Sequence, residues 1–435
     1  MMAGKKEIKL VPTEEQPYEI PENWCWVYLT AGFAECMDSF RKPINATERA
    51  TRIGSVPYYG ATGQVGWIDD YLTDDHLVLV GEDGAPFLDL VKEKAYIIEG
   101  KAWVNNHAHI LRSHYGKTGN VYLMNYLNIF DFTNYVNGTT RLKLTQASMN
   151  TIPVPLAPLA EQKRIVDTIV DLFADLDKAA ESAEKIVKQH DERRANLLHS
   201  AITGELTVTW RQAHGVDIND WTSSKIDDLC YSLKYGTAKK SKKTGPVVVL
   251  RMGNMQEGEI DWTDLAYTDD EEDIAKYHLE PGDVLFNRTN SATHVGKTSI
   301  YRGEYPAIYA GYLIKLDYDH SRVVGNYLTY ALNTPTAREY CQSVKTDGVN
   351  QSNINARKIG AFSIPLPSME EQQEIVRILD ELLGNEQRIK EAAEEMLDKI
   401  AMMKKSILAD AFRGKLGTND PSDQPATELL KQILA

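Results

Sequence analysis

The sequence predicts an α+β protein in which two strand-rich domains are separated by two long helices that form a coiled coil. Three observations predict this pseudo-two-fold internal repeat. Residues 155–206 recur at 365–416, and adding 210 to a residue number carries one copy onto the other without a gap. Each copy contains apolar residues in alternating steps of four and three, which is the seam of a coiled coil. The segment before each copy has short β-branched and aromatic runs between glycines, which is typical of short strands.

The first half of the chain divides into an arm, a domain and a helix. We expect residues 1–19 to form an N-terminal arm with little structure of its own and residues 20–154 to form the first domain, opening at Ile20-Pro-Glu-Asn-Trp24. Strands are predicted at 56–60, 64–68, 77–80, 96–98 and 109–111, and a helix at 125–134. Residues 155–206 are the first helical spacer.

The second half repeats this order after a linker at 207–220. The second domain spans 221–364, the second helical spacer 365–416 and a C-terminal tail 417–435. Strands are predicted at 246–252, 283–287, 298–301 and 310–316. A helix is predicted over 324–341, with an interruption near Pro335 because proline breaks the backbone hydrogen-bond ladder.

Both spacers begin after proline-rich breakers, one with Pro158 and the other with the Ser368-x-x-Glu371 capping box. The predicted seam comprises Ile165, Ile169, Leu172, Leu176, Ile186 and Leu197 in the first copy and Ile375, Leu379, Leu382, Ile389, Met396, Ile400, Met403 and Ile407 in the second. Its polar interruptions, His190, Arg193 and Glu386, either fix the register or face partner subunits. The alternative to a coiled coil is two amphipathic helices, each packed on its own domain.

Composition narrows the class of protein. The 435 residues are 43% hydrophobic, which is ample for packed cores. No apolar run approaches the ~20 residues of a membrane span, and the polar start lacks a signal-peptide core, so we expect a cytoplasmic protein with no membrane partner. The four cysteines show no metal-binding or disulfide spacing, so no metal site is predicted.

The net charge of -14 argues against nucleic acid unless the charges are separated. They are separated in the second domain. The basic residues Lys234, Lys239, Lys240, Lys242, Lys243 and Arg251 occur without an acid between 231 and 251, and nine acids then follow from Glu257 to Asp273 without a base. This segregation predicts a local positive face, with a solvated loop as the alternative.

Several short motifs suggest catalysis but lack the required pattern. Val295-Gly296-Lys297-Thr298 has Ser291 where a phosphate loop needs glycine. Glu82, Asp83, Glu99 and Lys101 could be arranged as in a nuclease, but such spacing is common by chance. His107 and His109 share a strand face without a third metal ligand. We therefore predict no active site in this chain.

A series of short motifs gives the chain a family resemblance over nearly its whole length. The motifs are Ile20–Trp24, Val56-Pro-Tyr-Tyr-Gly60, Trp103-Val-Asn-Asn-His107, Leu250-Arg-Met-Gly-Asn254, Pro281-Gly-Asp-Val-Leu-Phe-Asn-Arg288, Asn350-Gln-Ser-Asn353, Ile364-Pro-Leu-Pro367 and Glu371-Gln-Gln-Glu-Ile375. Because these motifs occur in this order around a 210-residue repeat, the chain resembles the DNA-specificity subunit of type I restriction-modification enzymes. The first domain has Thr145-Gln-Ala-Ser148 where we expect the counterpart of the Asn350–Asn353 run.

The resemblance implies a non-catalytic, sequence-specific DNA-binding subunit. Each domain would be a target recognition domain for one half of a bipartite, asymmetric double-stranded DNA target. The helices would form an antiparallel coiled coil that holds the domains apart and sets the gap. Two methyltransferase subunits and restriction-translocase subunits would be the partners, with S-adenosylmethionine, ATP and magnesium bound by those partners and no cofactor in this chain. The alternatives are a coiled-coil scaffold that binds only protein and a stand-alone nuclease.

Candidate DNA contacts are polar and basic residues of the two domains. In the first domain we select Arg41, Lys42, Tyr58, Tyr59, Gln64 and Arg141, and rank Asn106 and His107 lower because we expect them in a strand. In the second domain Lys239, Lys240, Lys242, Lys243 and Arg251 suit phosphates, and Asn254, Arg288, Asn290 and Lys297 could read base edges. A surface or structural role is the alternative for each.

Overall fold

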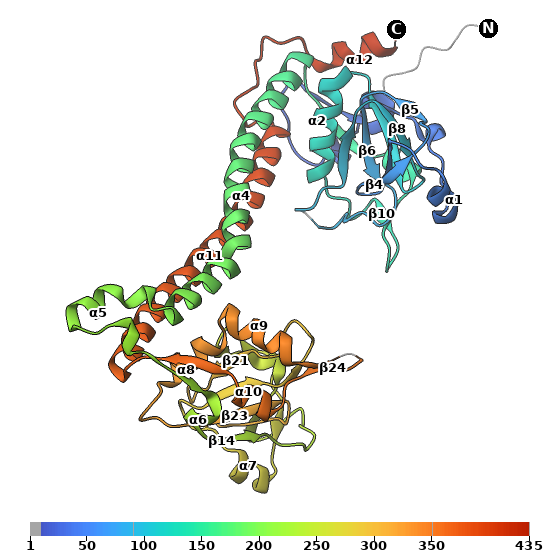
Figure 1. The fold of residues 1–435 in the computed structure, drawn as a ribbon. Coiled ribbons are helices and arrows are strands. Elements are labelled where there is room, and N and C mark those ends of the chain that lie inside the picture. Colours follow the sequence, from blue (N-terminus) through green and yellow to red (C-terminus); the bar gives the residue numbers. More distant parts are fainter. Residues whose placement is uncertain (1–9, 90, 350, 435) are drawn as a thin grey trace. The chain divides into compact units, whose positions relative to one another are not determined.

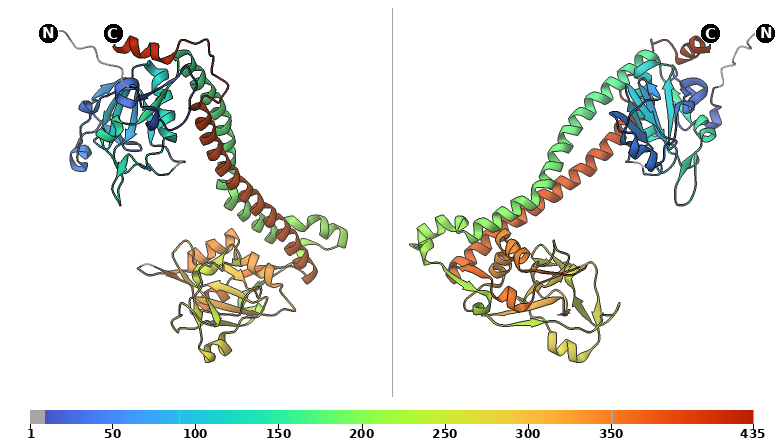
Figure 2. Two further views of the ribbon diagram at one scale, coloured as in Figure 1. Left: turned by 180° about the vertical axis from the view of Figure 1, so that it is seen from behind. Right: turned by 45° about the vertical axis from the view of Figure 1, so that its right-hand side comes forward.

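The computed structural model describes residues 10–89, 91–349 and 351–434, and the chain folds into two compact units. The first unit comprises residues 1–184 with 394–435, and the second comprises residues 185–393. Two long helices, α4 (Leu159–Ile202) and α11 (Met369–Ala411), each contribute one segment to each unit. Figures 1 and 2 show these helices running side by side. The predicted α+β repeat with paired helices is confirmed.

The helices pair in opposite directions within each unit. In the first unit the Lys404 ammonium, near the end of α11, pairs with Asp177 of α4 and stacks over the Phe173 ring. In the second unit Arg193 Nε, in the later part of α4, donates to Glu386 Oε2 at 2.7 Å. Arg193 and Glu386, two of the polar interruptions in the seam, therefore bond to each other, and the third, His190, is buried. No helix in the described part of the chain combines the length and apolarity of a membrane span.

The first domain is built from two four-stranded sheets with orders β2-β9-β6-β7 and β4-β3-β8-β5. Its strands are β1 (Cys25–Tyr28), β2 (Ala34–Cys36), β3 (Val56–Gly60), β4 (Gly63–Ile68), β5 (Thr73–Asp74), β6 (Leu77–Gly81), β7 (Ala95–Ile98), β8 (Lys101–Val104), β9 (Ala108–Ser113), β10 (Val136–Asn137), β11 (Lys143–Leu144) and β12 (Pro153–Leu156). Its short helices are α1 (Ala46–Thr51), α2 (Gly116–Ile129) and α3 (Gln146–Asn150). All five predicted strands are present. The predicted helix at 125–134 is shifted, because α2 ends at Ile129 and an aromatic turn follows.

The second domain repeats this plan, with a four-stranded sheet of order β14-β23-β19-β21 and a three-stranded sheet of order β18-β15-β22. Its strands are β13 (Thr222–Lys225), β14 (Cys230–Tyr235), β15 (Val247–Leu250), β16 (Met255–Gln256), β17 (Glu259–Ile260), β18 (Tyr267–Thr268), β19 (Val284–Asn287), β20 (Thr289–Asn290), β21 (Thr298–Ile300), β22 (Ala307–Tyr309), β23 (Leu313–Tyr318), β24 (Thr346–Asp347), β25 (Ser352–Asn353) and β26 (Ser363–Leu366). Its helices are α6 (Ile226–Leu229), α7 (Glu271–Tyr277), α8 (Gly325–Leu332), α9 (Pro335–Val344) and α10 (Ala356–Gly360). The predicted helix does break at Pro335, which opens α9 behind the Thr334 cap.

The duplication extends to the pairing of strands and to one tryptophan hydrogen bond in each half. β3 pairs with β8 in parallel, as β15 does with β22. Trp24 Nε1 donates to the buried carboxylate of Glu161 at 2.8 Å, and Trp221 Nε1 donates to Glu371 at 2.8 Å. The two domains therefore share one scaffold although their side chains diverge.

The coiled-coil seam is narrower than predicted. Leu172, Ile389, Met396 and Met403 have exposed fractions between 41% and 52%, so these four predicted seam positions are not buried. Leu383 and Leu408, outside the predicted seam, are buried instead. An α-helix of 3.6 residues per turn drifts by about 20° per heptad relative to a strict 3.5-residue repeat, so the buried stripe leaves the predicted positions.

The segments expected as arm, linker and tail pack more than predicted. Residues 1–9 of the arm lie outside the described residues, but Val11 is buried and its N–H bonds to Trp26 O at 3.1 Å. The linker contains α5 (Val208–His214), and the tail contains α12 (Ala426–Leu434), whose Ala426 and Leu430 lie in the core of the first unit. Apolar side chains explain the packing of the arm and the tail, because burying each stabilises the unit. The linker is held by polar groups instead, since Arg211 Nη1 donates to the buried carboxylate of Glu371 at 2.8 Å.

Candidate nucleic-acid interface

In the first domain, three loops meet where the central sheet ends. The residue after β6 is Glu82, whose N–H donates to the carbonyl of His107 at 2.7 Å and whose carbonyl accepts from Leu144 N–H at 2.7 Å. His107 lies in the turn between β8 and β9, and Leu144 closes the β10–β11 hairpin. The ends of neighbouring strands therefore bring distant segments of the chain to one edge.

The second domain makes the same two hydrogen bonds with other residues. Arg288 follows β19, its N–H donates to Tyr312 O at 3.0 Å, and its carbonyl accepts from Ile354 N–H at 2.8 Å. Glu82 thus corresponds to Arg288 and His107 to Tyr312. The helix caps Thr145 and Asn355 also correspond, so Lys143 matches Asn353. We call this region the loop edge: Glu82, Asp83, His107 and Lys143 in the first domain, and Arg288, Thr289, Tyr312 and Asn353 in the second.

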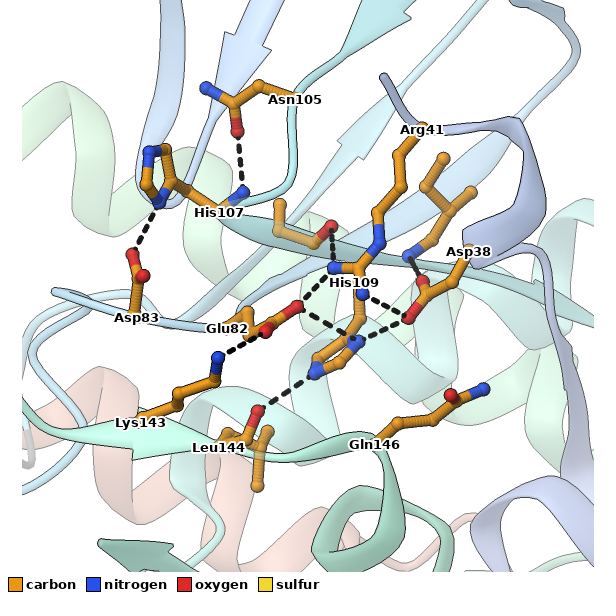
Figure 3. A network of polar contacts seen from close by, with 12 residues as sticks. Asp38, Arg41, Glu82, Asp83, Asn105, His107, His109, Lys143, Leu144 and Gln146 are labelled. Atoms are coloured by element: carbon orange, nitrogen blue, oxygen red, sulfur yellow. Dashed lines mark hydrogen bonds and ion pairs between the residues drawn. The ribbon is translucent and has the colours of Figure 1, made fainter. Parts of the chain in front are cut away.

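The loop edge of the first domain rests on a network of ion pairs (Figure 3). The Arg41 guanidinium lies between the carboxylates of Asp38, at 3.0 Å, and Glu82, which Lys143 also approaches at 3.0 Å. Burial acts to raise the pKa of Glu82, but the bonds from Lys143 and Arg41 outweigh it and lower the pKa. These contacts fix the base of the edge.

His109 completes the network and is fully buried. Its Nδ1 lies 2.6 Å from Asp38 Oδ2 and its Nε2 lies 2.9 Å from the carbonyl of Leu144, so each ring nitrogen faces an oxygen atom (Figure 3). Burial acts to raise the pKa of Asp38, but the hydrogen bond and charge of His109, together with the Ile110 N–H and Arg41, outweigh burial and lower the pKa. Although ligand atoms of Asp38, Glu82 and His109 lie within 4.8 Å of one another, Arg41 and Lys143 already neutralise the carboxylates. The cluster is a structural support.

Next to this buried network, Asp83 contacts the exposed side chains at the loop edge. Its Oδ1 accepts from Arg141 Nη2 at 2.7 Å and lies 2.6 Å from His107 Nδ1. The Arg141 side chain is 60% exposed. Charged donors therefore face solvent on the first domain.

The second domain presents mostly uncharged groups at the same positions. Arg288 stacks over Tyr235, with 4.8 Å from its guanidinium carbon to the ring centre, and donates to Asn353 Oδ1 at 3.1 Å. Asn353 Nδ2 donates to Thr289 Oγ1 at 2.8 Å. A cavity of about 690 Å³ beside them is lined by Thr289, Thr346, Asp347, Gly348, Val349, Gln351, Ser352 and Asn353. Tyr312, at 47% exposure, adds an aromatic face.

Two residues of the first domain that were predicted to contact DNA already interact with other side chains of this chain. Tyr58 is 2% exposed beneath Arg49, and Arg41 lies within the ion-pair network, so neither side chain is available at the surface. Lys42 and Gln64 are exposed, and Tyr59 is partly buried beside Tyr96. Asn106 and His107, ranked lower because a strand was expected, lie in the β8–β9 turn instead.

The predicted positive face of the second domain is partly neutralised. Lys239 bonds to Asp270 at 2.7 Å, Lys242 to Asp269 at 2.6 Å and Arg251 to Asp264 at 3.0 Å, so the basic and acidic runs pair with each other. Lys240 and Lys243 are exposed, and no ion pair involving them occurs among the described residues. These two lysines remain predicted phosphate contacts.

Two further predicted base contacts are structural. Asn254 is 2% exposed, accepts from Arg251 N–H and donates to the carbonyls of Asp261 and Asp264, each at 2.9 Å. Lys297 is half-buried and donates to Gln256 at 2.9 Å, and burial lowers its pKa. Asn290 lies in β20, where its Oδ1 accepts from Ser291 N–H at 2.8 Å.

The match proposed between Thr145–Ser148 and the Asn350–Asn353 run is wrong. Thr145 and Asn355 are both helix caps, each accepting from the N–H three residues on. The counterpart of residues 350–353 is therefore Thr140–Lys143, although Asn350 itself lies outside the described residues. Sequence reasoning missed Asp83 and Tyr312 as edge residues. Asp83 lies two residues after β6 and Tyr312 lies in the turn directly before β23, and these positions at strand ends were the available signal.

Comparisons with known proteins agree with this two-domain arrangement. The family model described as "Type I restriction modification DNA specificity domain" matches residues 35–185 and 218–395. The specificity subunit of the type I restriction enzyme StySPI from Salmonella potsdam is 29% identical over 302 residues, which are 66% of this chain and 65% of that protein. The EcoKI specificity subunit from Escherichia coli K12 is 27% identical over 305 residues, with 66% and 65% covered. The matches thus span slightly less than two thirds of these relatives.

Solved structures share the fold. A chain from a study of complex assembly and conformational transition of the type I restriction-modification system has a TM-score of 0.68 at 18% identity, with 92% of this chain and all of that chain covered. The crystal structure of the HsdS subunit from Thermoanaerobacter tengcongensis has a TM-score of 0.54 at 18% identity, covering 93% of this chain and all of its own.

Proposed function

Because the chain belongs to the type I restriction-modification DNA specificity family, we propose that it is the non-catalytic subunit that selects the DNA target of a cytoplasmic type I complex. Each recognition domain binds one half of a bipartite, asymmetric target. The paired helices set the gap between the halves.

One observation carries the proposal. Equivalent backbone positions hold His107 and Tyr312, or Lys143 and Asn353, so the two domains offer different donor and acceptor patterns on one scaffold. Sequence is read through donors and acceptors on base edges, so unlike patterns select unlike half-sites. The pairing of basic with acidic runs leaves little free positive charge, so affinity for phosphate comes partly from partner subunits.

The proposed partners are two methyltransferase subunits and restriction-translocase subunits, which hold S-adenosylmethionine, ATP and magnesium. Exposed apolar side chains on the helices, among them Met396, Met402 and Met403, support docking of protein there. Each is at least 49% exposed, as expected for a surface that a partner covers.

Long-read methylome mapping tests the proposal. A host expressing this chain with its methyltransferase should carry methylation at one motif made of two unlike half-sites and a gap of constant length. The methyltransferase alone is the control. Methylation that is independent of this chain, or no motif at all, would favour the protein-binding scaffold.

A further inference from the structure

The β10–β11 hairpin of the first domain presents one arginine in a prepared position. Asp83 forms a bridge with Lys143 in the backbone, and Gly84 N–H donates to Leu142 O at 3.1 Å, so the hairpin is tied to the segment after β6. Arg141 lies in this hairpin, where Asp83 Oδ1 accepts from its Nη2 at 2.7 Å.

The backbone of Gly84 forms a floor under the guanidinium. A Cβ at Gly84 would lie 3.1 Å from Arg141 Nε and 3.3 Å from Nη2, and the φ of +73° also favours glycine there. The Arg141 guanidinium thus lies against the backbone of Gly84 and is hydrogen-bonded to the carboxylate of Asp83. Holding a long side chain in place before binding reduces the entropy lost on binding.

The remaining donors of Arg141 point to a ligand outside the chain. Its side chain is 60% exposed, and among the described residues Asp83 is its only hydrogen-bonding partner. A planar guanidinium can donate two parallel hydrogen bonds to O6 and N7 of guanine, which is the commonest specific contact in the major groove. The counterpart of this hairpin position in the second domain, Gln351, is an exposed amide.

We infer that Arg141 is a specificity-determining residue of the first domain that reads a guanine, and that Asp83 is its positioning residue. This inference rests on the proposed function. It assigns one base class in one half-site to one side chain. His107, which shares the Asp83 carboxylate at 2.6 Å, limits the rotation of that carboxylate.

The test is methylome mapping of variants of the full chain expressed with its methyltransferase. Arg141→Ala and Arg141→Lys should lower discrimination at a single guanine of one half-site by about ten- to a hundredfold, because the bidentate contact is lost. Asp83→Asn should relax the same position less, and the other half-site and the gap should stay unchanged. Arg112→Ala is the matched control, because Arg112 is also an exposed arginine held by carboxylates, those of Glu35 and Asp75.

The outcomes separate this inference from the proposed function. If Arg141→Ala lowers methylation equally at all sites, abolishes it, or leaves the motif unchanged, Arg141 contacts phosphate or nothing and the inference is overturned. Retention of the full motif by Arg141→Lys would likewise show that charge alone matters. If the wild-type chain directs no bipartite methylation, the proposed function fails instead.

Discussion

A buried glutamate at the start of each long helix shows how duplicated residues acquire different energetics. Glu371 accepts from Trp221 Nε1, from Thr207 Oγ1 at 2.7 Å and from Arg211 Nη1 at 2.8 Å, so a guanidinium balances its charge. Glu161 accepts from Trp24 and from Asn419 Nδ2 at 2.9 Å, neither of them charged. Burial therefore raises the pKa of Glu161, because its bonds do not offset the loss of water.

This difference predicts opposite effects of one substitution. An acid with a raised pKa in the folded state contributes stability that is present below its ordinary pKa and is lost as pH rises through the raised value. We therefore expect Glu161→Gln to stabilise the first unit near pH 7, with the gain vanishing in acid. Glu371→Gln should destabilise the second unit by about 3 kcal/mol, because Arg211 is left unpaired. Urea unfolding of both variants between pH 4 and 7 measures this, and equal effects would contradict it.

Asn254 provides a second prediction for a single residue. Asn254→Ala leaves two carbonyls and one N–H without their partner, so we expect the free energy of unfolding of the second unit to fall by about 2 kcal/mol. The DNA motif should be unchanged, because the side chain is buried. Thermal unfolding and methylome mapping check both parts; Asn290→Ala, in the partly exposed β20, is the comparison. A changed base in the motif would restore Asn254 as a DNA contact.

Among the elements, α12 completes the first unit from the far end of the chain. Ala426 and Leu430 are buried in the core of that unit, and Asp423 pairs with Arg164 of α4. Asn419 supplies one of the bonds to Glu161. The segment predicted as a tail is thus a structural part of the first domain's support.

Truncation after Leu416 tests this role. Losing the burial of Leu430 alone costs about 2 kcal/mol, so amide hydrogen exchange should accelerate throughout the first unit. The second unit should keep its protection, because its core contains no residue of α12 among the side chains that the structure describes. Lys431→Ala, which removes only an exposed ion pair with Glu428, should leave both units unaffected. Equal protection of the first unit with and without the segment would refute the assignment.

For the whole molecule, the length of the helices is the property that the proposed function uses. Asp177 pairs with Lys404 in the first unit, so residues 178–184 of α4 are opposite 397–403 of α11 in the antiparallel arrangement. Deleting both heptads removes about 10 Å of helix, at about 1.5 Å per residue, while the apolar stripe keeps its phase.

We expect the paired deletion to shorten the gap in the methylated motif by about three base pairs, at about 3.4 Å per pair, with both half-sites retained. Methylome mapping measures the gap directly. Deleting only one of the two heptads is the control and should disrupt the pairing and reduce methylation. New bases in either half-site would contradict the proposed separation of spacing from recognition.

The 210-residue offset, the heptad pattern and the position of Pro335 determined the repeat, the helix pair and most strands, because these depend on local periodicity and on backbone chemistry near in sequence. The roles of individual side chains could not be predicted from this local information. Tyr58 and Asn254 are buried, and Arg41 forms ion pairs with Asp38 and Glu82, because the partners of these residues come from distant segments of the chain. Only the tertiary structure brought Asp83, Gly84 and Arg141 together, since their proximity depends on how the hairpin closes against the sheet.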